Sequence, residues 1–272
     1  MLNKENLHIA RQKRGQIDSS LSIEFSTLSN KESADLLQSK FSIERTIGAT
    51  LLGQRKAKEF VERLCEALKS DKALYSKIAI CEALISIGKE SVEPLSLLLG
   101  RIGNNQEIKL PGKYFKKKSY PLTRDIVART IIRIGESAVD KLIELSATKD
   151  NYLLSQIIDT LGGLLHKTND LKILVRLKMI LEENQHNDFL LWKTIRAFSA
   201  TNSEEVTLLI MPFLKHSQPA IRWETIRTLG LVGHQGSDIF VKIKTFRDDT
   251  DKQIRQASLD ALNRIEKRDI LK

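Results

Sequence analysis

Residues 225–230 read "TIRTLG", and the recurrence of this six-residue pattern decides the fold of the chain. The pattern is a small or polar residue, an apolar residue, two unrestricted positions, a second apolar residue and usually a glycine. It occurs seven times, as GATLLG (48–53), ALISIG (83–88), TIIRIG (130–135), IIDTLG (157–162), TIRAFS (194–199), TIRTLG (225–230) and SLDALN (258–263). Successive copies end 27 to 47 residues apart, with a mean of 35. A period of this length predicts an array of repeated structural units.

Each hexamer closes a stretch whose apolar residues recur at helical spacing, and its glycine is expected to end the helix in the left-handed conformation. A second amphipathic stretch precedes each copy, for example AKEFVERLCEALKS (57–70) or SEEVTLLIMPFLK (203–215). Short polar turns such as TKDN (148–151) separate the two stretches. Every unit is therefore predicted to be a helical hairpin. Because one hairpin cannot bury its apolar face alone, we expect neighbours to stack into an α-solenoid.

Three of the hexamer-bearing helices begin with an arginine preceded by an isoleucine, in IER (43–45), IRW (221–223) and IRQ (254–256). With the repeat length, this pattern resembles the HEAT repeat, particularly its short, lyase-like variety, over residues 30–266. The resemblance implies an all-α superhelix of about seven HEAT-like hairpins that binds a protein partner on its concave face. That face would be lined by the second helix of each hairpin, expected at 41–53, 73–88, 122–135, 151–165, 188–199, 218–230 and 251–266.

The segment before the array, residues 1–29, is expected to form a basic helix over 1–14 followed by a serine-rich tether, with the solenoid occupying 30–272. No apolar run approaches the length that crosses a membrane, and the N-terminus lacks the apolar stretch of a signal peptide. We therefore expect a soluble cytoplasmic protein that does not enter a membrane. Cys65 and Cys81 stand alone in the sequence, so we expect two buried, reduced thiols.

The net charge of +10 is concentrated in two places: residues 1–14 carry +3 and residues 101–133 carry +7. The second place holds an insertion, NNQEIKLPGKYFKKKSYP (104–121), between the two helices of the third hairpin. Lysines interleaved with aromatic residues suit a polyanion, although Leu110 and the aromatic side chains could instead cover the neighbouring hairpin. In this region the residues expected to contact a partner are Lys113, Tyr114, Phe115, Lys116, Lys117, Lys118, Tyr120, Arg124, Arg129 and Arg133.

Charged residues also occupy the third hexamer position, as Asp159, Arg196, Arg227 and Asp260. Equivalent positions of adjacent hairpins lie side by side, so we expect Asp159 to pair with Arg196 and Arg227 with Asp260. The alternative is a mixed-charge groove that recognises a peptide or an acidic partner. Arg129 and Arg133 are one helical turn apart and would repel each other unless they are paired.

Two tryptophans lie on successive second helices with basic neighbours. Trp192 precedes Arg196 by four residues, and Trp223 precedes Arg227 by the same spacing. Tryptophan and arginine are enriched in the energetic centres of protein interfaces, so these four residues join the expected partner-binding set. The alternative places Trp223 in the packing between repeats.

Catalytic chemistry finds little support in the sequence. GATLLGQR (48–55) has the glycine spacing of a phosphate-binding loop but lacks its lysine and the preceding strand. The five histidines never occur at helical i, i+4 spacing. We therefore predict no catalytic, metal or cofactor site.

The leading hypothesis is a non-enzymatic scaffold for a protein partner, with the insertion as an extra contact. A nucleic-acid-binding solenoid is the alternative, in its enzymatic form a relative of the alkylpurine DNA glycosylases, which also use HEAT-like repeats. Those enzymes pair aromatic residues with a carboxylate, whereas Trp192 has Arg196 one turn later. A bilin-lyase-like role is suggested only by the repeat sub-type.

Overall fold

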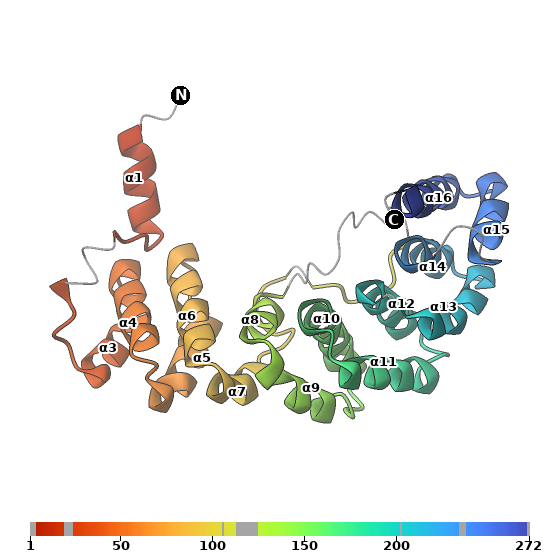
Figure 1. Cartoon of the computed structure of the whole chain (residues 1–272). Coiled ribbons are helices and arrows are strands. Elements are labelled where there is room, and N and C mark those ends of the chain that lie inside the picture. The colour runs from red at the N-terminus through yellow and green to blue at the C-terminus, as the bar shows by residue number, and fades with distance from the viewer. Residues whose placement is uncertain are drawn as a thin grey trace. The chain divides into compact units, whose positions relative to one another are not determined.

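The computed structural model describes residues 4–18, 24–104, 106–112, 125–201, 203–233 and 238–270. Within these ranges the chain is helical and forms no strand. The fold is an all-α solenoid of stacked helical hairpins (Figure 1). Packing divides the chain into two units: unit 1 comprises Met1–Asn104 and Asp125–Lys141, and unit 2 comprises Asn105–Arg124 and Leu142–Lys272.

Unit 1 contains the helices α1 (Lys4–Lys13), α3 (Asn30–Leu36), α4 (Ser42–Gln54), α5 (Val61–Ser70), α6 (Leu74–Ile87), α7 (Val92–Ser96) and α8 (Ile126–Ile134). The second helices α4, α6 and α8 pack side by side, and α3, α5 and α7 pair with them to form the other layer (Figure 1). Cys65 of α5 and Cys81 of α6 are buried free thiols, and burial raises the pKa of Cys65 to about 12.

The N-terminal helix α1 is joined to unit 1 by the residues that follow it. The carbonyl oxygen of Lys13 accepts a hydrogen bond from the Ser42 hydroxyl at 3.0 Å, and that of Gly15 accepts one from the Thr46 hydroxyl at 2.8 Å. Gly15 has φ +88°, a conformation that side chains rarely adopt. The predicted basic helix therefore ends in a turn that contacts α4.

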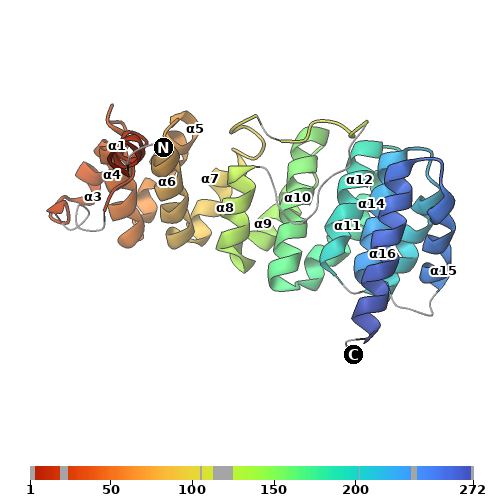
Figure 2. The same cartoon turned by 90° about the horizontal axis from the view of Figure 1, so that it is seen from above.

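Unit 2 continues from α9 (Val139–Leu145), which crosses the boundary between the units, through α10 (Asn151–Thr168), α11 (Leu171–Glu183), α12 (Asp188–Ala197), α13 (Glu204–Ile210), α14 (Pro219–Val232), α15 (Asp238–Lys244) and α16 (Lys252–Ile270). The helices α10, α12, α14 and α16 pack in that order and are called here the second-helix layer, with α12, α14 and α16 side by side in Figure 2. The helices α11, α13 and α15 form the other layer.

The sequence prediction of seven second helices is confirmed: α4, α6, α8, α10, α12, α14 and α16 begin and end within a few residues of the expected ranges. The insertion lies between α7 and α8, as expected. Helix starts follow from local sequence. Asp150 caps α10 by accepting the Tyr152 and Leu153 N–H groups at 2.8 and 3.1 Å, and Asn187 caps α12 by accepting the Leu190 N–H at 3.2 Å.

The expected role of the hexamer glycine is only partly correct. Gly88 and Gly135 end α6 and α8 at φ +85° and +93°, although their ψ of −126° and −140° differs from the left-handed helical conformation. Gly53 and Gly230 instead lie inside α4 and α14. A Cβ atom on Gly53 would stand 2.7 Å from the Cα of Ala83, and one on Gly230 would stand equally close to the next second helix. Inside the helices, the glycine therefore allows close approach of neighbouring backbones.

The arginine near the start of three second helices closes the preceding turn. Arg222 donates from Nη1 to the carbonyl oxygens six and five residues earlier, at 2.9 and 3.0 Å, and Arg255 does the same at 2.7 and 3.1 Å. Arg45 donates to the carbonyl oxygen six residues earlier at 2.8 Å. The recurring arginine thus satisfies carbonyl groups that the turn leaves without a backbone partner.

Candidate partner-binding site

The insertion is described over residues 106–112, which belong to unit 2. This stretch is called the strap. Eight of the residues expected to bind a partner lie outside the described residues: Lys113, Tyr114, Phe115, Lys116, Lys117, Lys118, Tyr120 and Arg124. Their contribution stays a prediction, and the described site is built from the strap and from α10, α12 and α14.

The ion pair expected between adjacent hairpins is present at α10 and α12. Arg196 of α12 donates from Nη2 to Oδ1 of Asp159 on α10 at 2.6 Å. Both residues occupy the third hexamer position, so the repeat register predicted their contact. Arg196 is fully buried, and the Asp159 side chain is 9% exposed. A buried ion pair of this kind depends on further polar contacts to offset the loss of hydration.

Two further charged residues complete this cluster, and the sequence reasoning did not identify either role. The Lys193 ammonium, also fully buried, lies 2.8 Å from Oδ2 of Asp159 and 3.2 Å from the carbonyl oxygen of Ser155. Glu107 of the strap accepts from Nη2 of Arg196 at 2.8 Å. Glu107 is 89 residues from Arg196 in the chain, so hairpin register carried no signal for this contact.

Each of the two cations, Arg196 and Lys193, also lies against an aromatic ring. The Arg196 guanidinium lies 4.5 Å from the centre of the Trp192 ring, and the Lys193 ammonium lies 5.1 Å from that of Phe189. Trp192 is only 4% exposed. As folded, Trp192 and Arg196 therefore offer almost no surface to a partner.

Among the described residues, the α12 cluster of Asp159, Lys193, Arg196 and Glu107 contains two cations and two carboxylates, and one of the carboxylates comes from the strap. Within α10 and α12, Arg196 and Lys193 share one carboxylate, that of Asp159, and Glu107 supplies the second. Burial lowers the pKa of Lys193, which Asp159 opposes and the nearby Arg196 reinforces, and the pKa remains below its ordinary value. Each cation in this cluster thus depends on an adjacent carboxylate.

One repeat later, α14 presents the equivalent residues differently. Trp223 is half-buried, with the Arg227 guanidinium 5.8 Å from its ring centre. The expected pair between Arg227 and Asp260 is wrong: Arg227 lies 3.4 Å from the buried carboxylate of Glu224 on its own helix, and Asp260 accepts from Gln256 at 2.9 Å. The pairing within one helix arises because Glu224 is one turn before Arg227.

The two arginines of α8 belong to unit 1. Arg133 forms a two-point ion pair with Glu82 of α6, with Nη2 donating to Oε2 at 2.7 Å, while Arg129 is exposed. The expectation that these neighbouring cations need a counter-charge holds for Arg133. Its charge is thereby offset locally.

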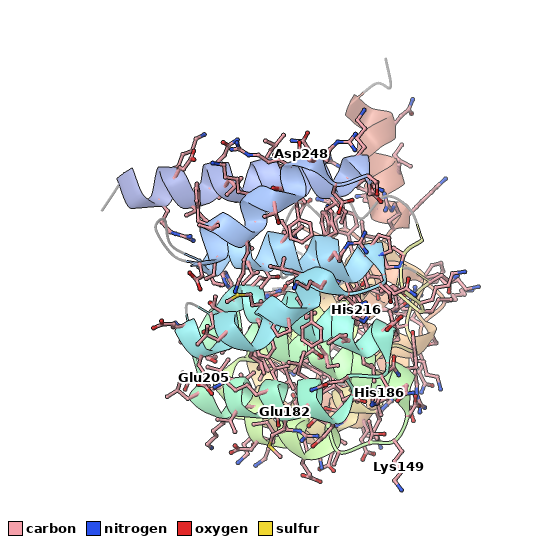
Figure 3. The ribbon with its side chains drawn as sticks, turned by 90° about the vertical axis from the view of Figure 1, so that its right-hand side faces the viewer. Lys149, Glu182, His186, Glu205, His216 and Asp248 are labelled. Atoms are coloured by element: carbon pink, nitrogen blue, oxygen red, sulfur yellow. The ribbon has the colours of Figure 1, made fainter. Side chains whose placement is uncertain are left out.

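A shallow groove of about 650 Å³ runs beside the strap. It is bordered by the strap residues Ile108 to Gly112 and by the turns that lead into α12 and α14. Figure 3 shows His186 and His216, which belong to these turns, at the same edge of unit 2 and Glu205 at the other side. The strap therefore lies near the edge at which the second helices begin.

In the described part of the chain, no three histidine, cysteine or carboxylate side chains gather as metal ligands would. The described helices include none with the length and apolar character needed to cross a membrane.

No family model and no curated protein sequence matches this chain. Among solved structures it is similar to an engineered protein (14% identity, covering 96% of this chain and 74% of the other, TM-score 0.43). A second engineered protein has 14% identity, coverage of 88% and 96%, and TM-score 0.42. A designed armadillo repeat protein has 11% identity, coverage of 87% and 100%, and TM-score 0.41. These likenesses are too low to bear on function, and the solenoid assignment rests on the packing of the chain's own helices.

Proposed function

We propose that the chain is a HEAT-like, non-enzymatic scaffold that binds a protein partner on the second-helix layer of unit 2, with the insertion as an extra contact. The observation that carries this proposal is the difference between α12 and α14. The tryptophan and arginine of α12 are buried, whereas Trp223 of α14 is half-exposed beside Arg227. A partly exposed tryptophan next to an arginine has the composition of an interface centre.

The packing supports the proposal. Successive second helices present equivalent residues at a regular spacing, so a partner segment that contacts Trp223 can extend along the layer to α16. Leu259 of α16 is 40% exposed and adds apolar surface in the next repeat. Such a layered surface suits an extended partner better than a small molecule.

The test is quantitative affinity capture from the source cells, comparing the wild-type chain with Trp223→Ala. The matched control is Leu171→Ala, which also removes apolar surface but lies on α11, in the other layer, and is 72% exposed. We expect one set of proteins to be captured by the wild type and the control and lost with Trp223→Ala, while circular dichroism shows all three chains folded. Equal capture by all three would refute the proposal.

A second candidate, nucleic-acid binding, is favoured by the net charge of +7 within residues 101–133. Binding through lysines to phosphates weakens steeply with salt. Fluorescence anisotropy with labelled duplex DNA and single-stranded RNA over a salt series would show it. The variant with Lys113, Lys116, Lys117 and Lys118 replaced by serine should then lose binding. A control with the same charge change replaces Lys58, Lys69, Lys72 and Lys89 and should retain it.

A further inference from the structure

The α12 cluster has the chemistry of a carboxylate-binding site, and in this structure the carboxylate of Glu107 occupies it. Its framework, α10 and α12, contributes two buried cations and one carboxylate. The remaining positive charge is offset by Glu107, which arrives from the insertion rather than from a neighbouring repeat. Without Glu107, the two buried cations would share the Asp159 carboxylate among the described residues, so an anion at the Glu107 position stabilises this framework.

The cations are arranged before any external ligand arrives. Trp192 lies against the Arg196 guanidinium, and Asp159 contacts both Arg196 and Lys193. The indole N–H of Trp192 is buried and donates to no acceptor within the described ranges. A fixed guanidinium with a second donor nearby matches a carboxylate, which can accept several hydrogen bonds.

The strap that brings Glu107 is only partly covered by the rest of unit 2. Ile108, the residue after Glu107, is 71% exposed, and Lys109 and Gly112 are also exposed. An isoleucine left in water adds little hydrophobic anchoring. The described strap thus places a carboxylate whose side chain is 15% exposed on a segment that gains little from apolar packing, next to an open groove.

We propose that Arg196 and Lys193 form a binding site for a carboxylate side chain of an acidic partner segment, and that Glu107 occupies this site until the partner displaces it. The proposal rests on the proposed partner-binding function and adds the chemistry of the partner. Displacement would expose Trp192 and Arg196, the residues that the sequence pattern had marked for binding. The partner's carboxylate would restore the charge balance that Glu107 provides in the free chain.

The charge of the insertion fits the same partner. Beyond the strap, the sequence from residue 113 to 118 carries four lysines and no acid. An acidic segment that replaces Glu107 would be attracted by these lysines as well as by Arg196. A basic or neutral segment would gain neither interaction.

The experiment uses a fluorescein-labelled hexaglutamate peptide as the probe, with binding measured by anisotropy at physiological ionic strength. In Glu107→Gln the resident carboxylate is removed, so we expect the peptide to bind at least about tenfold more tightly than to the wild type. Adding Arg196→Met should abolish the gain. That double variant keeps Lys193 paired with Asp159, so its framework is charge-balanced and should fold. The loop lysines are present in every variant, and their general attraction therefore cancels.

A second variant covers the possibility that Glu107→Gln does not fold. Glu107→Asp keeps the charge but shortens the side chain, and it should bind the peptide with an affinity between those of the wild type and Glu107→Gln. Equal affinities for the wild type and both Glu107 variants, or a gain that persists with Arg196→Met, would overturn the proposal. The peptide assay needs no cellular partner, so it fails independently of the capture experiment with Trp223→Ala.

Discussion

Replacing Gly230 by alanine tests whether the hexamer glycine sets the distance between second helices. In an ordinary helix this change would stabilise by about 1 kcal/mol, because alanine has the higher helix propensity. In α14, however, the new Cβ would stand 2.5 Å from the Cβ and 2.7 Å from the Cα of Ala261 on α16, against 3.4–4 Å for ordinary contact. The two helices must then separate by about 1 Å, and overpacking of this kind costs about 1–3 kcal/mol. We expect a net loss of up to about 2 kcal/mol.

The measurement is urea unfolding followed by circular dichroism, with amide hydrogen exchange along α16. Exchange should accelerate first in α16, because its loss of contact with α14 is direct. The control is Gly112→Ala, where a Cβ meets nothing within 4 Å, and its unfolding free energy should change by less than about 0.5 kcal/mol. A Gly230→Ala chain more stable than the wild type would show that helix propensity outweighs the contact, contrary to this reasoning.

Three further predictions concern charged residues. Burial would raise the pKa of Asp71, but hydrogen bonds, led by the one from Arg45, lower it below its ordinary value. The ionised Asp71 therefore stabilises the folded chain fully above the unfolded-state pKa of about 4. This stabilisation is lost as the pH falls through the folded-state pKa. Urea unfolding between pH 7 and pH 3 should therefore show a shallower acid loss in Asp71→Asn than in the wild type. Arg255→Ala should cost about 1–2 kcal/mol, since two turn carbonyls lose their donor, and Arg255→Lys should recover only part of the unfolding midpoint. Glu82→Ala should lower the free energy of unfolding by less than about 1 kcal/mol, because the paired Arg133 and Glu82 side chains are 55% and 50% exposed. Thermal unfolding measures this change, and a loss of stability as large as that of Asp71→Asn would contradict the prediction.

The helices were predictable because each second helix repeats the same local signals. Apolar spacing within the hexamer marked the buried face, and polar turns such as the one that contains Asp150 marked the helix starts. The contact of Asp159 with Arg196 followed from the same register. Local pattern and repeat spacing together therefore suffice to predict the helices of a hairpin and a contact between equivalent positions of neighbouring hairpins.

The rest of the site depends on contacts that no repeat period encodes. Glu107 contacts Arg196 from an insertion, and its sequence context of polar and apolar residues gave no indication of a buried ion pair. The sequence also did not predict which of the two tryptophans is exposed. Trp192 and Trp223 each precede an arginine by four residues, yet only Trp192 is buried. The spacing between the tryptophan and the arginine carries no information about this tertiary difference.

The two arginines at the third hexamer position show how one repeat pattern can serve two roles. Arg196 has a carboxylate from the previous second helix and another from the strap, whereas Arg227 pairs with Glu224 one turn before it. Glu224 stands at the position equivalent to Lys193, so exchanging a cation for an anion at this single place changes the requirement for an outside carboxylate. Under the proposed function, α14 would contact the partner through the exposed part of Trp223, and α12 would recognise a charged side chain. A partner that presents an acidic residue to α12 and an apolar one to α14 would engage both.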